Sequence, residues 1–171
     1  MTRFLQMILV SAIVGTLSLP ALAQTSDDIE TLDRKDVPPA VTAQLRCKTP
    51  EGQPTRRAFA GGFVYVQRCM FAGRGAEDVL VFAADKTGAN ARLLQFHRPE
   101  GRRVSSLANV AWNSKEQEIA GHVGRLSRRI CRAEGRWKLE GKPPSPALVY
   151  WRHTRDCDGK TGWQTMVNRK S

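Results

Sequence analysis

The stretch that decides the fold is ICRAEGRWKLEGKPPSPALVYWRHTRDC, residues 130–157. Two runs of alternating polar and apolar residues, 130–141 and 147–157, flank the turn sequence KPPSP, and each run carries one cysteine. Alternation with a period of two is typical of β-strands, and a proline-rich segment between two such runs favours a turn. The sequence therefore predicts an antiparallel hairpin.

A disulfide between Cys131 and Cys157 would set the register of this hairpin if the two cysteines face each other. Both tryptophans, an aliphatic pair and the disulfide would then share one face. Gly135 would leave room for the imidazole opposite, whereas two arginines would oppose each other on the wet face at a small cost. The expected facing pairs are Trp137 with Trp151, Leu139 with Val149, Gly135 with His153, Lys138 with Tyr150, Glu134 with Thr154, and Arg136 with Arg152.

Short apolar runs separated by turn residues continue through the rest of the chain from residue 63. The segment 47–62 is rich in proline and glycine and is expected to be a loop, and DKTGAN at 85–90 is expected to be a hairpin loop. This texture predicts a mostly β fold, an antiparallel β-sandwich or barrel-like meander of about eight short strands. The expected strands are 63–69, 79–84, 91–98, 109–113, 118–124, 130–141, 147–157 and 163–169.

The N-terminal end has the pattern of a secretory signal peptide over residues 1–23, with Arg3 before an apolar run and Ala21-Leu22-Ala23 before the cleavage point. A membrane anchor is the alternative, but the apolar run is short for a span of about 20 residues. Residues 24–46 are expected to be an acidic, flexible leader, with either a short helix at 39–46 or disorder. Residues 47–171 are expected to form a single disulfide-bonded β domain. These features predict a periplasmic or secreted protein that is not integral to a membrane once processed.

Four cysteines follow the predicted signal, an even number in an exported chain. In an oxidising compartment this indicates two disulfides, for which three connectivities are open. The hairpin favours Cys131 with Cys157, which leaves Cys47 with Cys69. A zinc site is the alternative, but the chain has no C-x-x-C and no His/Cys pair at ligand spacing.

The sequence TRDCDGKTGW, residues 154–163, could be a calcium loop or a turn after a strand. Asp156 and Asp158 begin a pattern of the calcium type, but the twelfth position is Val167 where a glutamate is needed. Asp-Gly and Thr-Gly are turn chemistry, and the same DKTG tetrapeptide stands between two expected strands at 85–88. A turn is therefore favoured, and no metal site is predicted.

A recognisable order of blocks runs over residues 63–169. Its residues are Leu107, Asn109, Trp112 and Gly121, the hairpin from Trp137 to Gly141, the two cysteines around it, and Trp163 with Arg169. This order resembles the C-terminal half of an exported proteobacterial family known as domain of unknown function 1176. The resemblance implies no established activity, cofactor or catalytic residue, and the chain lacks the longer N-terminal half of that family.

The sequence gives little indication of a set of catalytic residues. A histidine-dependent hydrolase needs a base beside an activated nucleophile, yet there is no G-x-S-x-G motif and every cysteine is expected to be oxidised. His97 and Glu100 lie at a strand end before a proline, where their side chains would not meet. No catalytic, cofactor-binding or metal residues are predicted, and the protein is expected not to be an enzyme. The groups considered are His97, His122 and His153, and the carboxylates Glu77 with Asp78 and Glu116 with Glu118, which are expected to be turn-like or solvated.

The basic residues are the most informative surface feature, with 27 Lys and Arg against 16 Asp and Glu and a net charge of +11. Arginine forks suit phosphates and carboxylates, which occur in lipopolysaccharide, peptidoglycan and anionic lipids. No nucleic-acid motif is present. The candidate anion-binding residues are Arg98, Arg102, Arg103, Arg125, Arg128, Arg129 and Arg132.

Three functions remain open from sequence. The first is a non-enzymatic binding or structural module of the cell envelope, with a basic surface for an anionic polymer or lipid. The second is a partner of another protein, such as an inhibitor or accessory factor of an envelope hydrolase. The third is a hydrolase, which would need the histidines to cluster with an acid. Binding that weakens with salt would favour the first function over the second.

Overall fold

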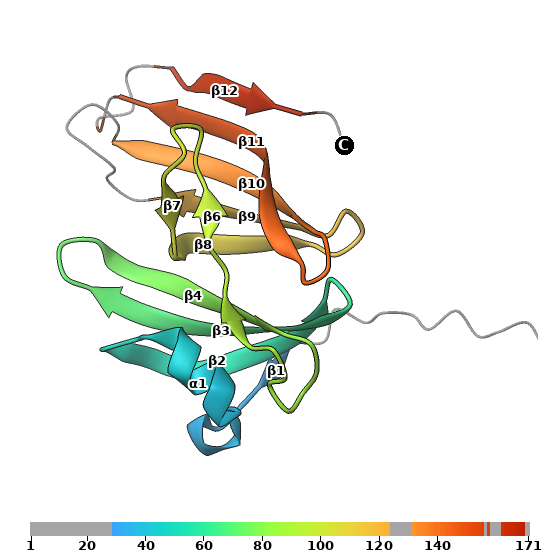
Figure 1. Ribbon diagram of the computed structural model, residues 1–171. Coiled ribbons are helices and arrows are strands. Elements are labelled where there is room, and N and C mark those ends of the chain that lie inside the picture. The colour runs from blue at the N-terminus through green and yellow to red at the C-terminus, as the bar shows by residue number, and fades with distance from the viewer. Residues whose placement is uncertain (1–28, 124–130, 156, 158–161, 170–171) are drawn as a thin grey trace, which may run out of the picture.

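The computed structural model describes residues 29–123, 131–155, 157 and 162–169 of the chain (Figure 1). Within these residues the fold is mostly β, with one α-helix and one 3-10 helix. The elements are β1 (Glu30–Thr31), η1 (Arg34–Asp36), α1 (Pro39–Leu45), β2 (Pro50–Phe59), β3 (Gly62–Phe71), β4 (Gly75–Ala83), β5 (Arg92–Leu93), β6 (Phe96–His97), β7 (Arg103–Val104), β8 (Ser106–Asn113), β9 (Glu118–Val123), β10 (Arg132–Glu140), β11 (Ser145–Thr154) and β12 (Gln164–Asn168).

All strand pairings are antiparallel and follow the order β1-β2-β3-β4-β8-β9-β10-β11-β12, with β5 added to β4 and β6 paired with β7. Figure 1 shows a lower sheet formed by β1 to β5 and an upper sheet formed by β8 to β12. The two sheets meet where β4 pairs with β8 at Asp78–Leu107 and Val79–Ser106. Because β1 and β12 lie at opposite ends of this order, the strands do not close into a barrel. The predicted mostly β, antiparallel fold is therefore confirmed as a sandwich.

The main core lies between the two sheets. Trp137 and Trp151 are fully buried on one face of the hairpin and meet edge to face, with ring centroids 6.2 Å apart. Phe96 of β6 contacts Trp137 at 5.1 Å, and the indole N–H of Trp137 donates to the carbonyl of His97 at 2.7 Å. These contacts fasten the β6–β7 hairpin onto the upper sheet. The buried members are Phe59, Val64, Leu80, Phe82, Leu94, Phe96, Leu107, Ile119, Val123, Ala133, Trp137, Leu139 and Trp151.

A second core lies on the other face of the lower sheet and corrects the prediction of a flexible leader. Residues 29–46 contain β1, η1 and α1, and their apolar side chains are buried against β3 and β4. The helix alternative is therefore observed, with Pro39 in the first turn, where a missing backbone N–H costs nothing. The predicted signal peptide and residues 24–28 lie outside the described residues. The leader side chains in this core are Leu32, Val37, Val41 and Leu45.

The segment expected to be a loop at 47–62 is instead largely the strand β2, which pairs along β3. Pro50 and Pro54 suggested a loop because proline cannot donate to a ladder. The structure tolerates them because the register shifts between Glu51 and Thr55, which leaves Gly52, at φ 64°, in an irregularity of the strand.

The single strand expected at 91–98 is divided into β5 and β6. The backbone N–H of Leu94 donates to the carbonyl of Leu80 at 2.9 Å. The chain then leaves the lower sheet and forms the separate β6–β7 hairpin, which packs against the upper sheet. The expected hairpin loop before β5 is confirmed. The pKa of Asp85 lies below its usual range because its carboxylate accepts several hydrogen bonds. The largest effect comes from the Thr87 hydroxyl, and smaller ones come from the backbone N–H groups of Ala89, Thr87 and Gly88.

The hairpin at 130–157 forms as expected, but the predicted register is wrong by two residues up to Arg136 and by three residues from Trp137 onward. Gly135 faces Trp151 and Glu134 faces Arg152, and the register shifts again between Arg136 and Trp137. Trp137 pairs with Leu148, and the irregularity skips Val149 in the ladder, so Trp137 and Trp151 are both still buried on the core face. Two physical reasons favour this register: Arg152 faces Glu134 rather than the expected Arg136, and Gly135 makes room for the Trp137 indole rather than for an imidazole.

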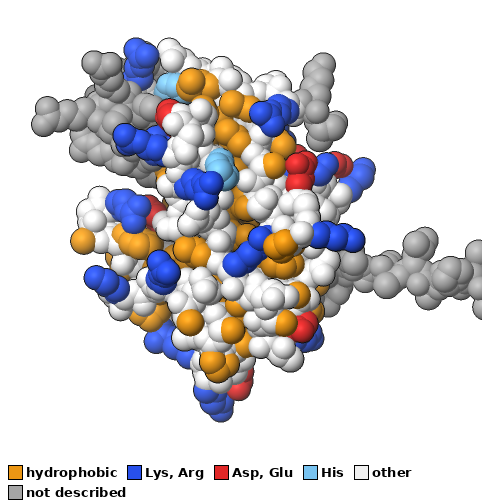
Figure 2. All heavy atoms as spheres, in the orientation of Figure 1, with side chains coloured by type: hydrophobic (Ala, Val, Ile, Leu, Met, Phe, Trp, Pro, Cys, Tyr) orange, Lys and Arg blue, Asp and Glu red, His pale blue; other side chains and the backbone are white. Residues whose placement is uncertain are grey.

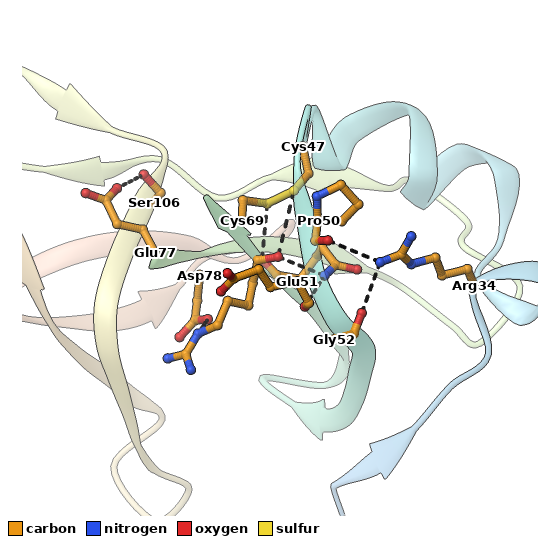
Figure 3. Close-up of a disulfide and its surroundings, with 11 residues drawn as sticks. Arg34, Cys47, Pro50, Glu51, Gly52, Cys69, Glu77, Asp78 and Ser106 are labelled. Carbon is orange, nitrogen blue, oxygen red and sulfur yellow. Dashed lines mark hydrogen bonds and ion pairs between the residues drawn. A yellow bond between two sulfur atoms is a disulfide. The ribbon is translucent and has the colours of Figure 1, made fainter. Parts of the chain in front are cut away.

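Both predicted disulfides are present. Cys47, after α1, bonds to Cys69 of β3 with Cα atoms 5.7 Å apart, as Figure 3 shows. Cys131 bonds to Cys157 with Cα atoms 5.2 Å apart, beyond the end of the hairpin ladder. Two disulfides are typical of proteins from oxidising compartments. Among the described residues, no helix is long and apolar enough to cross a membrane.

The junction between the sheets holds a buried carboxylate. Glu77 of β4 accepts a hydrogen bond from the Ser106 hydroxyl of β8 (Figure 3). The Glu77 carboxylate also lies 3.6 Å from Arg74, and both Glu77 and Ser106 are buried. A Ser106→Ala variant is expected to lose about 2 kcal/mol of unfolding free energy, because the carboxylate loses a donor that water cannot replace. Urea unfolding measures this loss. The exposed neighbour Ser105→Ala is the control, and an equal effect of both variants would contradict the assignment.

Candidate anion-binding site

The predicted basic residues of the β6–β7 hairpin differ in their exposure and in their hydrogen-bond and ion-pair partners. The Arg98 side chain is only 10% exposed, and its Nε and Nη2 each lie 3.2 Å from a Glu100 carboxylate oxygen. Arg103 donates to the Gln95 amide oxygen at 3.1 Å. The backbone carbonyl of Arg102 accepts from the Arg98 N–H at 2.9 Å, but its exposed side chain has no hydrogen-bond or ion-pair partner within the described part of the chain.

The Arg98–Glu100 pair is an internal ion pair. Burial alone would raise the pKa of Glu100, but the Arg98 hydrogen bond, the residue's own backbone N–H and the charges of Arg98 and His153 together lower it. The charge of Arg98 is therefore already compensated, and this residue is removed from the candidate site. Of the other predicted arginines, Arg132 is exposed at the start of β10, and Arg125, Arg128 and Arg129 lie outside the described residues.

The structure instead gathers basic side chains around a hollow of about 180 Å³. It lies between the β5–β6 segment and the turn that joins β10 to β11. His97 and Arg103 are direct cross-strand partners in the β6–β7 hairpin, so their side chains leave the same face. No lining residue is acidic. The lining is Arg92, Leu93, Leu94, Gln95, His97, Arg103, Pro144, Ser145 and Pro146.

Arg92 has the least compensated charge in this hollow. Its Nε and Nη2 are buried without a hydrogen-bond partner, so Nη1 is the nitrogen that solvent can reach. The guanidinium lies 5.7 Å from the Phe82 ring centroid, and no carboxylate among the described residues pairs with it. Burial lowers the pKa of Arg92, yet an arginine side chain stays charged at neutral pH. An anion that enters the hollow would supply the missing compensation.

The size of the hollow limits what can enter it. Sites for whole drug-sized ligands measure about 300–1,000 Å³, so a hollow of about 180 Å³ suits one charged group of a larger molecule. Arg92 and Arg103 can each donate to a phosphate or carboxylate, and the Ser145 hydroxyl and His97 imidazole add further polar contacts. The arrangement is suited to binding an anionic group.

Arg92 was not among the predicted site residues. In sequence it is a lone cation in an expected strand, whereas the predicted residues stood in runs of arginines. Its environment arises because the chain leaves the lower sheet after β5 for the β6–β7 hairpin and there meets the β10–β11 turn. No local pattern carries that information.

The three histidines do not share a site. His97 lines the hollow, His153 is buried on the core side of β11, and His122 lies on the opposite face of the upper sheet, 3.2 Å from Glu134. A hydrolase built on a histidine cluster would need them together.

Two expectations about carboxylates are wrong. Glu118 is buried and ion-paired with Arg136 at 3.4 Å, and Glu77 is buried in β4, because both belong to strands rather than turns. Asp156 and Asp158 lie outside the described residues, among which no cluster of three metal-binding side chains occurs. Comparisons with family models, with curated proteins and with solved structures found no match for this chain.

Proposed function

We propose that the protein is an exported, non-enzymatic module of the cell envelope that binds anionic groups of an envelope polymer or lipid. The observation that carries this proposal is the hollow in which Arg92, His97 and Arg103 meet without an acid. The proposal includes the signal peptide at 1–23 and the resemblance to the 1176 family, both inferred from sequence.

The wider surface supports the same ligand class. The chain has a net charge of +11, and Figure 2 shows Lys and Arg side chains spread over the face that carries the β6–β7 hairpin, with few Asp and Glu among them. A surface of one sign raises the local concentration of oppositely charged partners. The exposed Arg102 next to the hollow would add a second contact to a polymer with repeated charges.

The test is co-sedimentation of residues 24–171 with lipopolysaccharide vesicles and, separately, with peptidoglycan sacculi over a series of salt concentrations. Binding is expected to weaken several-fold as salt rises to physiological strength, where the Debye length falls to about 8 Å. An Arg92→Met/Arg103→Met variant is expected to bind about tenfold or more weakly, because each arginine contributes a charge-assisted hydrogen bond worth about 1.5–3 kcal/mol. The vesicles and sacculi distinguish phosphate from carboxylate sources.

A Lys48→Met/Lys115→Met variant is the matched control, since it removes the same charge from exposed positions away from the hollow. Equal loss in both double variants would show that net charge acts without a site, and it would contradict the assignment of the hollow. The alternative function, a partner of an envelope hydrolase, predicts one-to-one binding to a protein that survives moderate salt.

A further inference from the structure

A second hollow lies on the face of the upper sheet that points away from the main core. It measures about 460 Å³ and is shallow and open. Its side chains alternate along the strands with the buried ones, so Glu134 and Arg136 point outward while Ala133 and Trp137 point into the core. The lining is Asn109, Ala120, Gly121, His122, Glu134, Gly135, Arg136, Tyr150 and Arg152.

The charges in this second hollow are compensated within the protein. Arg136 lies 3.4 Å from the Glu118 carboxylate, and Arg152 is hydrogen-bonded to Glu134. The other oxygen of Glu134 lies 3.2 Å from His122 Nε2. This arrangement is the reverse of the Arg92 hollow, where no acid is present, and it offers an incoming anion no uncompensated arginine.

Both arginines are also stacked on aromatic rings. The Arg136 guanidinium lies 4.8 Å from the Tyr150 ring centroid, and the Arg152 guanidinium lies 4.6 Å from that of Trp163. Ion pairs on one side and rings on the other fix the planes of the guanidinium groups. Trp163 does not itself line the hollow, but it is 40% exposed, so this ring presents apolar surface to solvent beside Arg152, which does.

Uncharged polar side chains extend this face onto β12. Thr165 pairs with Arg152 and Asn168 pairs with Tyr150 in the sheet register, so both belong to the outward row. With Asn109 they supply donors and acceptors that carry no charge. The face therefore combines aromatic surface, fixed planar polar groups and little uncompensated charge.

We propose that this outward face of β9 to β12 binds a neutral oligosaccharide. A sugar ring presents an apolar C–H face, which suits an exposed indole, and a rim of hydroxyls, which need donors and acceptors held in fixed positions. Paired arginines and carboxylates meet this need without favouring a charged ligand. This site is independent of the Arg92 hollow and does not rest on the proposed anion binding.

The test is calorimetric titration of residues 24–171 with two neutral probes, tetra-N-acetylchitotetraose and cellotetraose, in about 0.5 M NaCl, where charge contacts are screened to about 4–5 Å. At least one probe is expected to bind. Trp163→Ala is expected to weaken this binding about fivefold to tenfold through lost ring contact. Glu134→Gln is expected to weaken it about tenfold, because His122 and Arg152 lose their shared carboxylate.

Met70→Ala is the matched control, since Met70 is also an exposed apolar side chain, 44% exposed, and lies on β3 of the lower sheet, outside this face. This variant and Arg92→Met/Arg103→Met are both expected to bind the neutral probe with unchanged affinity. The proposal is overturned if neither tetrasaccharide binds at about 10 mM, or if Trp163→Ala and Glu134→Gln bind as Met70→Ala does. Because the probes are uncharged and the arginine variant differs, failure here is distinguishable from failure of the anion site.

Discussion

A Gly135→Ala variant is expected to lose about 3 kcal/mol of unfolding free energy, at the upper end of the range for overpacked cores. The added Cβ would lie 2.5 Å from Cζ2 and 2.7 Å from Cζ3 of the Trp137 indole, and closer still to Cη2. Trp137 cannot move aside, because Phe96 and Trp151 contact it on the core side and its N–H is bonded to the carbonyl of His97. The strain must therefore be taken up by the backbone of β10.

Urea unfolding followed by tryptophan fluorescence measures this loss. Gly162→Ala is the control, because a Cβ at Gly162 would meet nothing within 4 Å and the position has no unusual backbone conformation. A further comparison uses a Trp137→Leu background, in which the ring that causes the clash is absent. There Gly135→Ala should destabilise by far less, and additive effects of the two substitutions would contradict a direct clash.

Trp137 and Trp151 show which features of the hairpin its sequence determines and which it does not. Alternation identifies which residues share a face, and it correctly predicted that Trp137 and Trp151 meet in the core. It does not determine register, because any shift of two residues keeps the faces unchanged. The disulfide was expected to resolve this, but Cys157 lies past the last pair of the ladder, Arg132 with Thr154, and is not opposite Cys131 within it.

The missed elements share a physical cause: their stability comes from tertiary packing. The apolar residues of 29–46 have no strong period, yet Leu32 and Val41 are buried because β3 and β4 offer them an apolar face. β2 contains two prolines that favour a loop locally, but its pairing with β3 and a register shift outweigh them. Local propensity is a weak prior wherever a neighbouring sheet can supply the missing contacts.

Of the predicted anion-binding residues, only Arg103 lines the hollow that we propose as the anion site. Runs of arginine indicated an anion-binding surface, and Arg103 does line the hollow. Arg98 does not serve there because Glu100, two residues later, pairs with it, an interaction that charge counting ignores. Arg92 has no acidic partner because of where the chain crosses between sheets, and this property exists only in three dimensions.

Removal of either disulfide is expected to destabilise the protein by about 3 kcal/mol or more. The bridges close similar spans, with sequence separations of 22 and 26, so the loss of loop-closure entropy in the unfolded chain is similar for both. Cys47→Ala/Cys69→Ala should cost about 1 kcal/mol more than Cys131→Ala/Cys157→Ala. Cys69 is buried in the second core, where its sulfur also fills volume, whereas Cys157 is exposed.

Exposure also sets the order of reduction in the native protein. Attack by an external thiolate requires access to a sulfur, so dithiothreitol should open Cys131–Cys157 before Cys47–Cys69. Timed alkylation and mass spectrometry of the peptides measure this order, and earlier labelling of Cys69 would contradict it.

Since the Cys131–Cys157 bridge lies beyond the ladder, its opening should raise amide exchange near Thr154 and leave the exchange of Trp137 unchanged. A rise along the whole of β10 would instead show that the bridge, and not the packing of the two tryptophans, holds the hairpin together.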